Sequence, residues 1–344
     1  KGSTVHFLGA LLRAAGQCCG AFTSPHLLTI RERFLIDGKP VSYEELLAAA
    51  HGFEAELRRR HLKPTLFEIM TILALLLFRR RSCDYALMET GIGGLLDATN
   101  YISDPVCTVI TSVSFDHVQL LGGSIEEIAA QKAGIIKPNV PVICGKQRFA
   151  EAEEVLRRTA EEKGAPFIPA SRYTPPPLPQ LGVLPGFQEK NLQTAWAVCR
   201  VLGLNPDTRA VTAPVLPGRC QVVSENPLVI LDAAHNADSA MELAKAVRTL
   251  YPHDEFTVIL GVVKGKDAEG ILRELTSLGS EFILTNPRSH KGTELERLSA
   301  AAEVLGLRYE VNPDIKDRKE LPDGNLLFTG SFFTALIGAD LFRQ

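Results

Sequence analysis

The chain has 344 residues, a length that favours two domains with a cleft between them over one or three. Its 37 Lys and Arg residues nearly balance its 40 Asp and Glu residues, and the net charge of −3 excludes a global electrostatic attraction to nucleic acid or to an anionic membrane. With 45% hydrophobic and 22% charged residues, the composition is that of a globular protein and excludes disorder as the main state.

The seven cysteines lie in apolar stretches and form no C-x-x-C pair. We therefore expect reduced thiols in a cytoplasmic protein, and neither a disulfide framework nor a zinc knuckle. The longest apolar run, Ile69–Phe78, is too short to span a membrane, and no secretory segment heads the chain. The chain starts at Lys1 without an initiator Met, as though it had been entered in the middle of a motif.

The first part of the chain alternates between helical and strand patterns. Apolar spacing from Val5 to Ala15 predicts a helix directly after the N-terminus, and Leu66–Arg80 predicts a long helix that is apolar nearly all round and hence buried. Ser42 with Glu45, and Ser124 with Glu127, form capping boxes for two further helices. Strands are predicted at Cys18–Phe22, Ile30–Ile36, Tyr85–Glu89, Val106–Ser112 and Val140–Cys144.

The alternation resumes late in the chain and predicts a second parallel sheet. Between the two parts lie the Pro-rich stretch Thr174–Pro185 and a helix near Asn191–Leu202. The late strands are predicted at Leu228–Leu231, Phe256–Val262, Phe282–Thr285 and Leu326–Thr329, and the late helices at Asp238–Leu250, at Ala268–Leu278 and after a cap formed by Thr293 and Glu296.

The connector Pro214–Arg219 has paired prolines, which stiffen a hinge without supporting a helix or a central strand. We therefore predict three parts: an ATP-binding domain over residues 1–213, a hinge linker over 214–219 and a C-terminal domain over 220–344. The expected fold class is α/β, with a P-loop-type parallel-sheet ATPase domain followed by a smaller Rossmann-like α/β domain and a cleft between them.

The N-terminal residues Lys1, Gly2, Ser3 and Thr4 run directly into a helix, as in the second half of a phosphate-binding loop. In such a loop the lysine reaches the β- and γ-phosphates, the helix N–H groups hold oxygens, and a hydroxyl binds Mg²⁺. Taken alone, these four residues are more typical of a disordered basic N-terminus than of a phosphate-binding loop.

Polar residues follow two of the next predicted strands. Glu89 ends one strand and leads into a glycine-rich turn, and Asp116-His117 follows another. The carboxyl ends of strands form the ligand crevice of an open α/β sheet, so we expect Glu89 and His117 to converge beside Ser3. Taken singly, each residue has a simpler alternative: Glu89 as a surface carboxylate and His117 as a hydrogen-bonded turn residue.

An ordered set of segments covering essentially the whole chain resembles the folylpolyglutamate synthase/dihydrofolate synthase family of the Mur ligase superfamily. The segments are Lys1–Thr4, Thr23–Leu27, Glu89–Asn100, Ser114–His117, Lys132–Pro138, Leu216–Arg219, Asp232–Asn236 and Thr329–Ser331. The resemblance implies an ATP-dependent ligase, with L-glutamate and a folate or dihydropteroate as its substrates, that is monomeric and has no nucleic acid or membrane partner.

The resemblance also implies roles for single residues. Two Mg²⁺ ions would be held by Ser3, Glu89, Ser24 and His117, and Lys132 occupies the position of a lysine that is carbamylated by CO₂ in the superfamily. Lys1, Lys132, His235 and Ser331 are implied as catalytic residues, and ATP would be bound by Lys1, Gly2, Ser3, Thr4, Gln188, Asn191, Arg219 and Asp232. Gln188 and Asn191 would lie at the adenine, Arg219 at a phosphate and Asp232 at the ribose.

The implied reaction is amide formation through an acyl phosphate, with folylpolyglutamate synthesis as the expected activity and dihydrofolate synthesis as an additional one. Other Mur-superfamily amino-acid ligases, and a nucleotide-binding homologue without catalysis, remain as alternatives. The chain departs from the family pattern at Leu95, where an arginine is usual, and at Ala233, where a glycine is usual. These two changes leave the choice of substrate open. Beside the family, the chain also looks short near Thr174–Pro185, Thr208–Pro214 and Asp314–Asp323.

Overall fold

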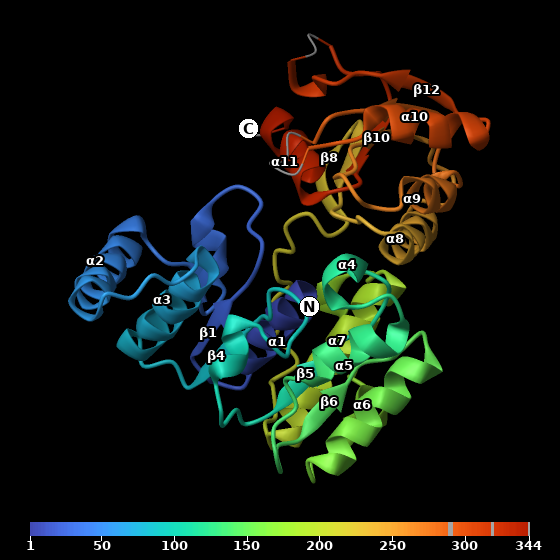
Figure 1. The fold of residues 1–344 in the computed structure, drawn as a ribbon. Helices are drawn as coiled ribbons and strands as arrows, with labels where there is room; N and C mark the ends of the chain where they lie inside the picture. The colour runs from blue at the N-terminus through green and yellow to red at the C-terminus, as the bar shows by residue number, and fades with distance from the viewer. Residues whose placement is uncertain (288–291, 318–319, 343–344) are drawn as a thin grey trace. The chain divides into compact units, whose positions relative to one another are not determined.

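The structure is a computed structural model that describes residues 1–287, 292–317 and 320–342. The chain divides into two compact units, one made of Lys1–Leu184 and Gln188–Val215, the other of Pro185–Phe187 and Leu216–Gln344. Each unit combines helices with parallel strands (Figure 1), which confirms the predicted α/β class.

The first sheet of the first unit has the strand order β3-β2-β1-β4. Strand β1 is parallel to β4 but antiparallel to β2, so this sheet is mixed. Its strands are β1 (Cys19–Phe22), β2 (Phe34–Ile36), β3 (Lys39–Pro40) and β4 (Tyr85–Met88), and its helices are α1 (Gly2–Ala14), η1 (Ile30–Arg33), α2 (Tyr43–Arg60), α3 (Leu66–Arg80) and η2 (Ala98–Tyr101).

The second sheet of this unit is parallel, with the order β5-β6-β7. The parallel strands predicted for the first domain are thus divided between two sheets, and among the described residues β4 pairs only with β1 and β5 only with β6. The elements are β5 (Thr108–Ile110), α4 (Val118–Leu121), α5 (Ile125–Ala133), β6 (Val142–Cys144), α6 (Ala150–Glu162), β7 (Phe167–Pro169), η3 (Ala170–Arg172), η4 (Pro179–Leu181) and α7 (Gly186–Val201).

The second unit contains one sheet with the order β12-β11-β10-β13-β9-β8. Strands β9, β10, β11 and β13 are parallel, as predicted; β12, which was not predicted, pairs parallel with β11, and β8 is an antiparallel edge strand. The elements are β8 (Gln221–Glu225), β9 (Leu228–Leu231), α8 (Ala237–Leu250), β10 (Phe256–Leu260), α9 (Ala268–Leu275), β11 (Glu281–Leu284), α10 (Leu295–Val304), β12 (Arg308–Val311), η5 (Ile315–Asp317), β13 (Asn325–Thr329) and α11 (Phe332–Leu341).

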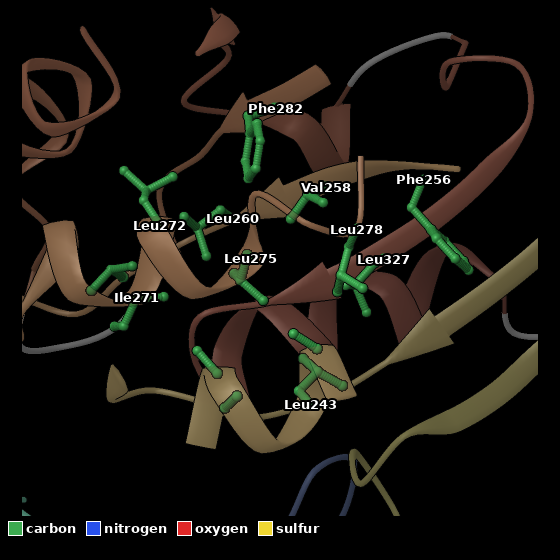
Figure 2. Packing of buried hydrophobic residues seen from close by; sticks show 14 of the residues in the cluster. Leu243, Phe256, Val258, Leu260, Ile271, Leu272, Leu275, Leu278, Phe282 and Leu327 are labelled. Carbon is green, nitrogen blue, oxygen red and sulfur yellow. The ribbon is translucent and has the colours of Figure 1, made fainter. Parts of the chain in front are cut away.

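One face of the second unit's sheet is covered by an apolar cluster, shown in Figure 2. Phe256, Val258 and Leu260 alternate along β10, so all three face the same side and pack with Leu272 and Leu275 of α9. Truncating a fully buried leucine such as Leu275 to alanine costs about 2–5 kcal/mol. This core fixes the carboxyl ends of β9 and β13, which Asp232 and Ser331 follow.

Several predicted elements differ from the structure. Ile30–Arg33 is a 3₁₀ turn and not a strand, because the Glu32 carboxylate accepts the N–H groups of Leu27, Leu28 and Thr29 and closes a tight loop. Helix α3 is not buried all round, since Leu66 is 67% exposed. Helix α10 begins after Glu294, because the Thr293 hydroxyl donates to the Val262 carbonyl instead of capping the helix.

Helix α6 was not predicted, although Ala152, Val155, Leu156 and Ala160 give it a buried stripe at helical spacing.

All seven cysteines are free thiols. Among the described residues, no helix is long and apolar enough to cross a membrane.

Candidate functional site

The N-terminus of helix α1 meets the glycine-rich turn that follows β4. The Lys1 ammonium donates to the carbonyls of Thr90, at 2.5 Å, and Gly91, at 3.0 Å. Ser3 and Thr4 are buried in the first turn of the helix. The amide groups of a helix N-terminus carry a partial positive charge, so this junction is suited to an anion such as phosphate.

The Glu89 carboxylate lies beneath this helix end. Glu89 is only 5% exposed, and its Oε2 accepts the Ser24 N–H at 3.2 Å. A Cβ placed on Gly2 would lie 3.4 Å from the same oxygen, an ordinary van der Waals contact, so the carboxylate lies directly beside the helix end. The structure thus brings together Lys1, Gly2, Ser24 and Glu89.

His117 lies in the left-handed region, with φ 51°, immediately before α4. Its backbone N–H donates to Asp116 at 2.9 Å, and its ring Nε2 lies 3.7 Å from the other Asp116 oxygen. The described residues contain no group of three or more His, Cys, Asp or Glu side chains that could hold a metal ion. Any Mg²⁺ bound here would need hydroxyl, water and phosphate oxygens beside Glu89.

Lys132 lies in the last turn of α5. Its pKa is lowered to about 8, first by burial and then by the nearby Lys1 ammonium, while Asp116 acts in the opposite direction. A substantial fraction of the Lys132 amine is therefore neutral and nucleophilic at slightly alkaline pH.

The glycine-rich turn packs directly on the backbone that carries Lys132. A Cβ on Gly94 would lie 2.8 Å from the Gln131 carbonyl oxygen and 2.9 Å from that of Lys132. The Leu95 N–H donates to the same Gln131 carbonyl at 2.8 Å. The turn therefore fixes the end of α5 through its backbone.

Gly94→Ala is expected to displace the end of α5 and to destabilise the protein by about 1–3 kcal/mol. Gly123→Ala is the matched control, because a Cβ at Gly123 meets no atom within 4 Å. Chemical denaturation of both variants tests this expectation, and equal stability of the two would contradict it.

Gln188 and Asn191 lie side by side on α7. The Asn191 amide donates to Gln188 Oε1 at 3.1 Å, and Asn191 Oδ1 accepts the Thr4 hydroxyl at 3.1 Å. Gln188 is 2% exposed, and its Nε2 has no hydrogen-bond partner among the described residues. A buried amide donor without a partner costs free energy, so this side chain is suited to a ligand that accepts a hydrogen bond.

In the second unit, Asp232 follows β9 and is 5% exposed. Its two oxygens accept the N–H groups of Cys220 and Ala234, each at 2.7 Å. Burial raises the pKa of this carboxyl group, whereas Arg219 and the two N–H donors act to lower it. Each oxygen retains one lone pair for a further donor.

Arg219 lies over the Phe332 ring, with 4.8 Å from its guanidinium carbon to the ring centroid, and donates to the Gly218 carbonyl at 3.2 Å. His235 Nδ1 lies 2.9 Å from the Ala233 carbonyl oxygen. Ser331 is 2% exposed and caps α11, where its Oγ accepts the Thr334 N–H. All three side chains therefore have contacts within their own unit.

The two departures from the family pattern lie in different environments. Leu95 is 49% exposed, and its backbone packs on Gly134, where a Cβ would lie 2.5 Å from Leu95 Cα. Ala233 is 2% exposed, and its N–H donates to the Gly218 carbonyl at 2.9 Å. Leu95 thus presents an apolar side chain to the surface, while the Ala233 methyl group is enclosed.

Sequence reasoning missed Arg33, whose Nε donates to His26 Nδ1 at 2.8 Å. Burial lowers the pKa of Arg33, while Glu89 and Glu32 act to raise it, so Arg33 belongs to the surroundings of Glu89. The signal was three consecutive charged residues, Arg31 to Arg33, inside an otherwise apolar run.

Comparisons with known proteins show which family the chain is related to. Residues 218–325 match the family described as Mur ligase, glutamate ligase domain. The dihydrofolate synthase/folylpolyglutamate synthase of Bacillus subtilis is 30% identical over 97% of this chain and 86% of its own length, and that of Escherichia coli is 33% identical over 87% of this chain and 73% of its own length. The folylpolyglutamate synthase of Mycobacterium tuberculosis complexed with ADP has 28% identity and a TM-score of 0.86, over 100% of this chain and 88% of that one.

The two α/β units, with the matched family and solved structures, define a protein with the two-domain Mur ligase fold. Within that class, the chain belongs to the folylpolyglutamate synthase/dihydrofolate synthase family.

Proposed function

We propose that the chain joins L-glutamate to the γ-carboxylate of a folate at the expense of ATP. The observation that carries this proposal is the helix N-terminus with Lys1 above the buried Glu89, in a chain whose relatives are named for this synthesis. In the first step a γ-carboxylate oxygen would attack the γ-phosphorus of ATP and release ADP. The glutamate amine would then attack the acyl phosphate carbonyl and release phosphate.

ATP binding is proposed for residues of both units. In the first unit, Lys1, Gly2, Ser3 and Thr4 would face the phosphates, and the unpartnered Nε2 of Gln188 beside Asn191 would face the adenine. In the second unit, Arg219 would neutralise phosphate charge, and Asp232 would accept ribose hydroxyls with its remaining lone pairs. ADP in the Mycobacterium tuberculosis structure supports nucleotide binding within the family.

Two Mg²⁺ ions are proposed to bind together with ATP at a set of four donor residues. Glu89, Ser3, Ser24 and His117 offer a carboxylate, two hydroxyls and an imidazole, and Mg²⁺ commonly takes one or two carboxylates and completes its shell with phosphates and water. Bound Mg²⁺ would neutralise charge on the transferring phosphoryl group. The Ser24 N–H donates to the Glu89 carboxylate and so holds the negative charge of that side chain in place.

Carbamylation of Lys132 is proposed on the basis of its lowered pKa. The neutral amine would attack the carbon of CO₂ and lose a proton, which converts a cation into an anion. An anion at this position would help to hold Mg²⁺, whereas the ammonium would repel it. His235 and Ser331 are proposed to act at the glutamate site.

Dihydropteroate is proposed as a second acceptor, because the Bacillus subtilis and Escherichia coli relatives are both named dihydrofolate synthase/folylpolyglutamate synthase.

We further propose an ATP-binding domain over residues 1–213, a hinge at 214–219 and a ligase domain over 220–344. A monomer without nucleic acid or membrane partners, located in the cytoplasm, accords with the free thiols and the net charge of −3.

ADP release by the purified protein with Mg·ATP and L-glutamate tests this function. We expect release that depends on a reduced folate, and a second rate with dihydropteroate if both acceptors are used. No ADP release with any folate or with dihydropteroate would contradict the proposed activity.

Gln188→Leu is expected to raise the KM for ATP about 10-fold, because an unpaired hydrogen bond in a buried site costs about 1–3 kcal/mol. The KM for L-glutamate should stay unchanged. Gln180→Leu is the control, since Gln180 is exposed and donates to the Thr208 carbonyl in the same unit. An unchanged KM for ATP in Gln188→Leu would remove the adenine role.

A further inference from the structure

Two partly exposed cysteines, Cys18 and Cys83, lie at the amino ends of the adjacent strands β1 and β4. The strands are parallel, with Cys19 opposite Tyr85, so Cys18 directly precedes β1 and Cys83 lies two residues before β4. The Cys18 carbonyl accepts the N–H groups of Asp84, at 2.9 Å, and Tyr85, at 3.2 Å. The backbone next to Cys83 is therefore tied to that of Cys18.

The thiols of these two cysteines face each other. The Cys83 thiol is hydrogen-bonded to the Cys18 sulfur, and the Cys18 thiol is also hydrogen-bonded to the Asp37 side chain. Cys19 points elsewhere, because its buried Sγ lies 3.7 Å from the Gly9 carbonyl oxygen. Neighbouring strands lie about 4.8 Å apart, within the range of about 4.4–6.8 Å between Cα atoms that a disulfide spans. The two sulfurs can therefore be joined without moving the strands apart.

We propose that Cys18 and Cys83 form a site of reversible oxidation, at which a low-molecular-weight disulfide such as oxidised glutathione converts the two thiols into one intramolecular disulfide. Cys18 Sγ loses its proton to solvent and attacks one sulfur of the small disulfide, whose S–S bond breaks and releases one thiol. Cys83 Sγ then attacks Cys18 Sγ, and the second small thiol leaves. The two protein thiols thus lose two electrons and two protons, which the small disulfide gains.

The contact between the thiols sets the order of the two attacks. Burial raises the pKa of both groups. The hydrogen bond between them adds to the rise at Cys83, whose pKa reaches about 12, but acts to lower the pKa of Cys18. Because the thiolate is the nucleophile, Cys18 reacts first and Cys83 resolves the mixed disulfide.

The disulfide cross-links two segments that are far apart in the sequence. It closes the loop from Cys18 to Cys83, which contains β1, β2, β3, α2 and α3. A cross-link of this kind lowers the conformational entropy of the unfolded chain, so we expect the oxidised protein to resist unfolding. Ser24 and Glu89 follow the opposite, carboxyl ends of β1 and β4, so the cross-link leaves the candidate phosphate site in place.

Incubation of the purified full chain with oxidised glutathione, followed by alkylation of the remaining thiols and peptide mapping by mass spectrometry, tests the site. We expect a Cys18–Cys83 peptide pair that is lighter by two hydrogen atoms and that dithiothreitol returns to two free thiols. The midpoint of urea unfolding should be higher for the oxidised protein than for the reduced protein. Neither measurement needs turnover, so the result is independent of the proposed ligase activity.

Single serine substitutions separate the two cysteines. Cys83→Ser should retain glutathione on Cys18 as a mixed disulfide, because the resolving thiol is missing. Cys18→Ser should form neither the cross-link nor a comparable mixed disulfide at Cys83. Neither variant should become more resistant to urea on oxidation.

Cys107 and Cys199 are the matched control pair. Burial and then the nearby Cys107 raise the pKa of Cys199 to about 12, and Cys199 is fully buried. Cys107→Ser should therefore leave the cross-link and the gain in resistance to urea unchanged. Absence of a Cys18–Cys83 pair, equal oxidation of Cys107 and Cys199, or glutathione that stays on Cys18 in the unaltered chain would each overturn the site. A cross-link that formed without raising the unfolding midpoint would overturn its stabilising role.

Discussion

Lys132→Ala is expected to lower folate-dependent ADP release at least 100-fold while leaving the fold intact. The variant removes the carbamate that would help to hold Mg²⁺, and a metal that stabilises transition-state charge is worth several kcal/mol, with about 1.4 kcal/mol for each tenfold in rate. Stability should change little, because burial disfavours the charged form of this side chain. ADP release under saturating Mg·ATP, folate and L-glutamate measures the effect.

The pH dependence of CO₂ reactivation gives this prediction a second readout. Only the neutral amine attacks CO₂, and with a pKa of about 8 the neutral fraction of Lys132 is about one tenth at pH 7 and about nine tenths at pH 9. Enzyme stripped of CO₂ should therefore regain activity with bicarbonate faster as the pH rises through 8, at equal dissolved CO₂. A lysine with an ordinary pKa would show this rise about two and a half pH units later.

Lys137→Ala is the control for Lys132→Ala. Lys137 follows α5, its pKa is also lowered by burial, and its ammonium donates to the Asn100 carbonyl at 2.9 Å. We expect this variant to keep most of its activity and its response to bicarbonate. Unchanged rates in Lys132→Ala, or equal losses in both variants, would remove the carbamylation role.

The fold was predictable wherever one periodicity dominated the sequence. Leu66–Arg80 combines an apolar run with a Thr65–Glu68 capping box, and the helix spans the predicted residues. Phe256–Leu260 is apolar except for Thr257 and forms a central strand of the second unit's sheet. In both segments the local preference and the burial agree, so tertiary contacts had no reason to override the pattern.

Prediction failed where long-range contacts decide the structure. In strand β12 (Arg308–Val311) charged residues alternate with Tyr309 and Val311, and most of the strand is exposed, so no apolar run indicates it in the sequence. The strand is defined by its pairing with β11. The division of the first unit into two sheets is likewise a matter of strand pairing, which no local pattern encodes.

For the candidate site, the sequence identified residue types and the structure supplied their contacts. A glycine after a lysine suggested a phosphate loop. The closeness of Gly2 to Glu89, however, is a tertiary contact between residues 87 positions apart in the sequence. The unpartnered Nε2 of Gln188 is a property of its surroundings and has no signature in the sequence. The lowered pKa of Lys132 requires both its burial and the nearby Lys1.

Glu89→Gln is expected to lower ADP release at least 100-fold without a matching loss of stability. Glutamine has nearly the same shape, and its Oε1 can still accept the Ser24 N–H that Glu89 Oε2 accepts at 3.2 Å. The negative charge, however, disappears from beneath the N-terminus of α1, where the proposed Mg²⁺ would need an anionic ligand. Steady-state ADP release against Mg²⁺ concentration measures the effect, and higher Mg²⁺ should restore part of the rate.

The contrast with a surface carboxylate separates a metal role from a general charge effect. Glu162 lies in the same unit at the end of α6, its side chain is 66% exposed, and its distance to Arg158 is 3.9 Å. Glu162→Gln removes the same charge from a solvated position, where an ion pair contributes at most about 1 kcal/mol, so its Mg²⁺ dependence should match that of the unaltered protein. If Glu89→Gln instead kept its rate but unfolded more easily, the Glu89 carboxylate would serve to hold the loop at Ser24, and the proposed metal site would lose its only buried anion among the ligands assigned to it.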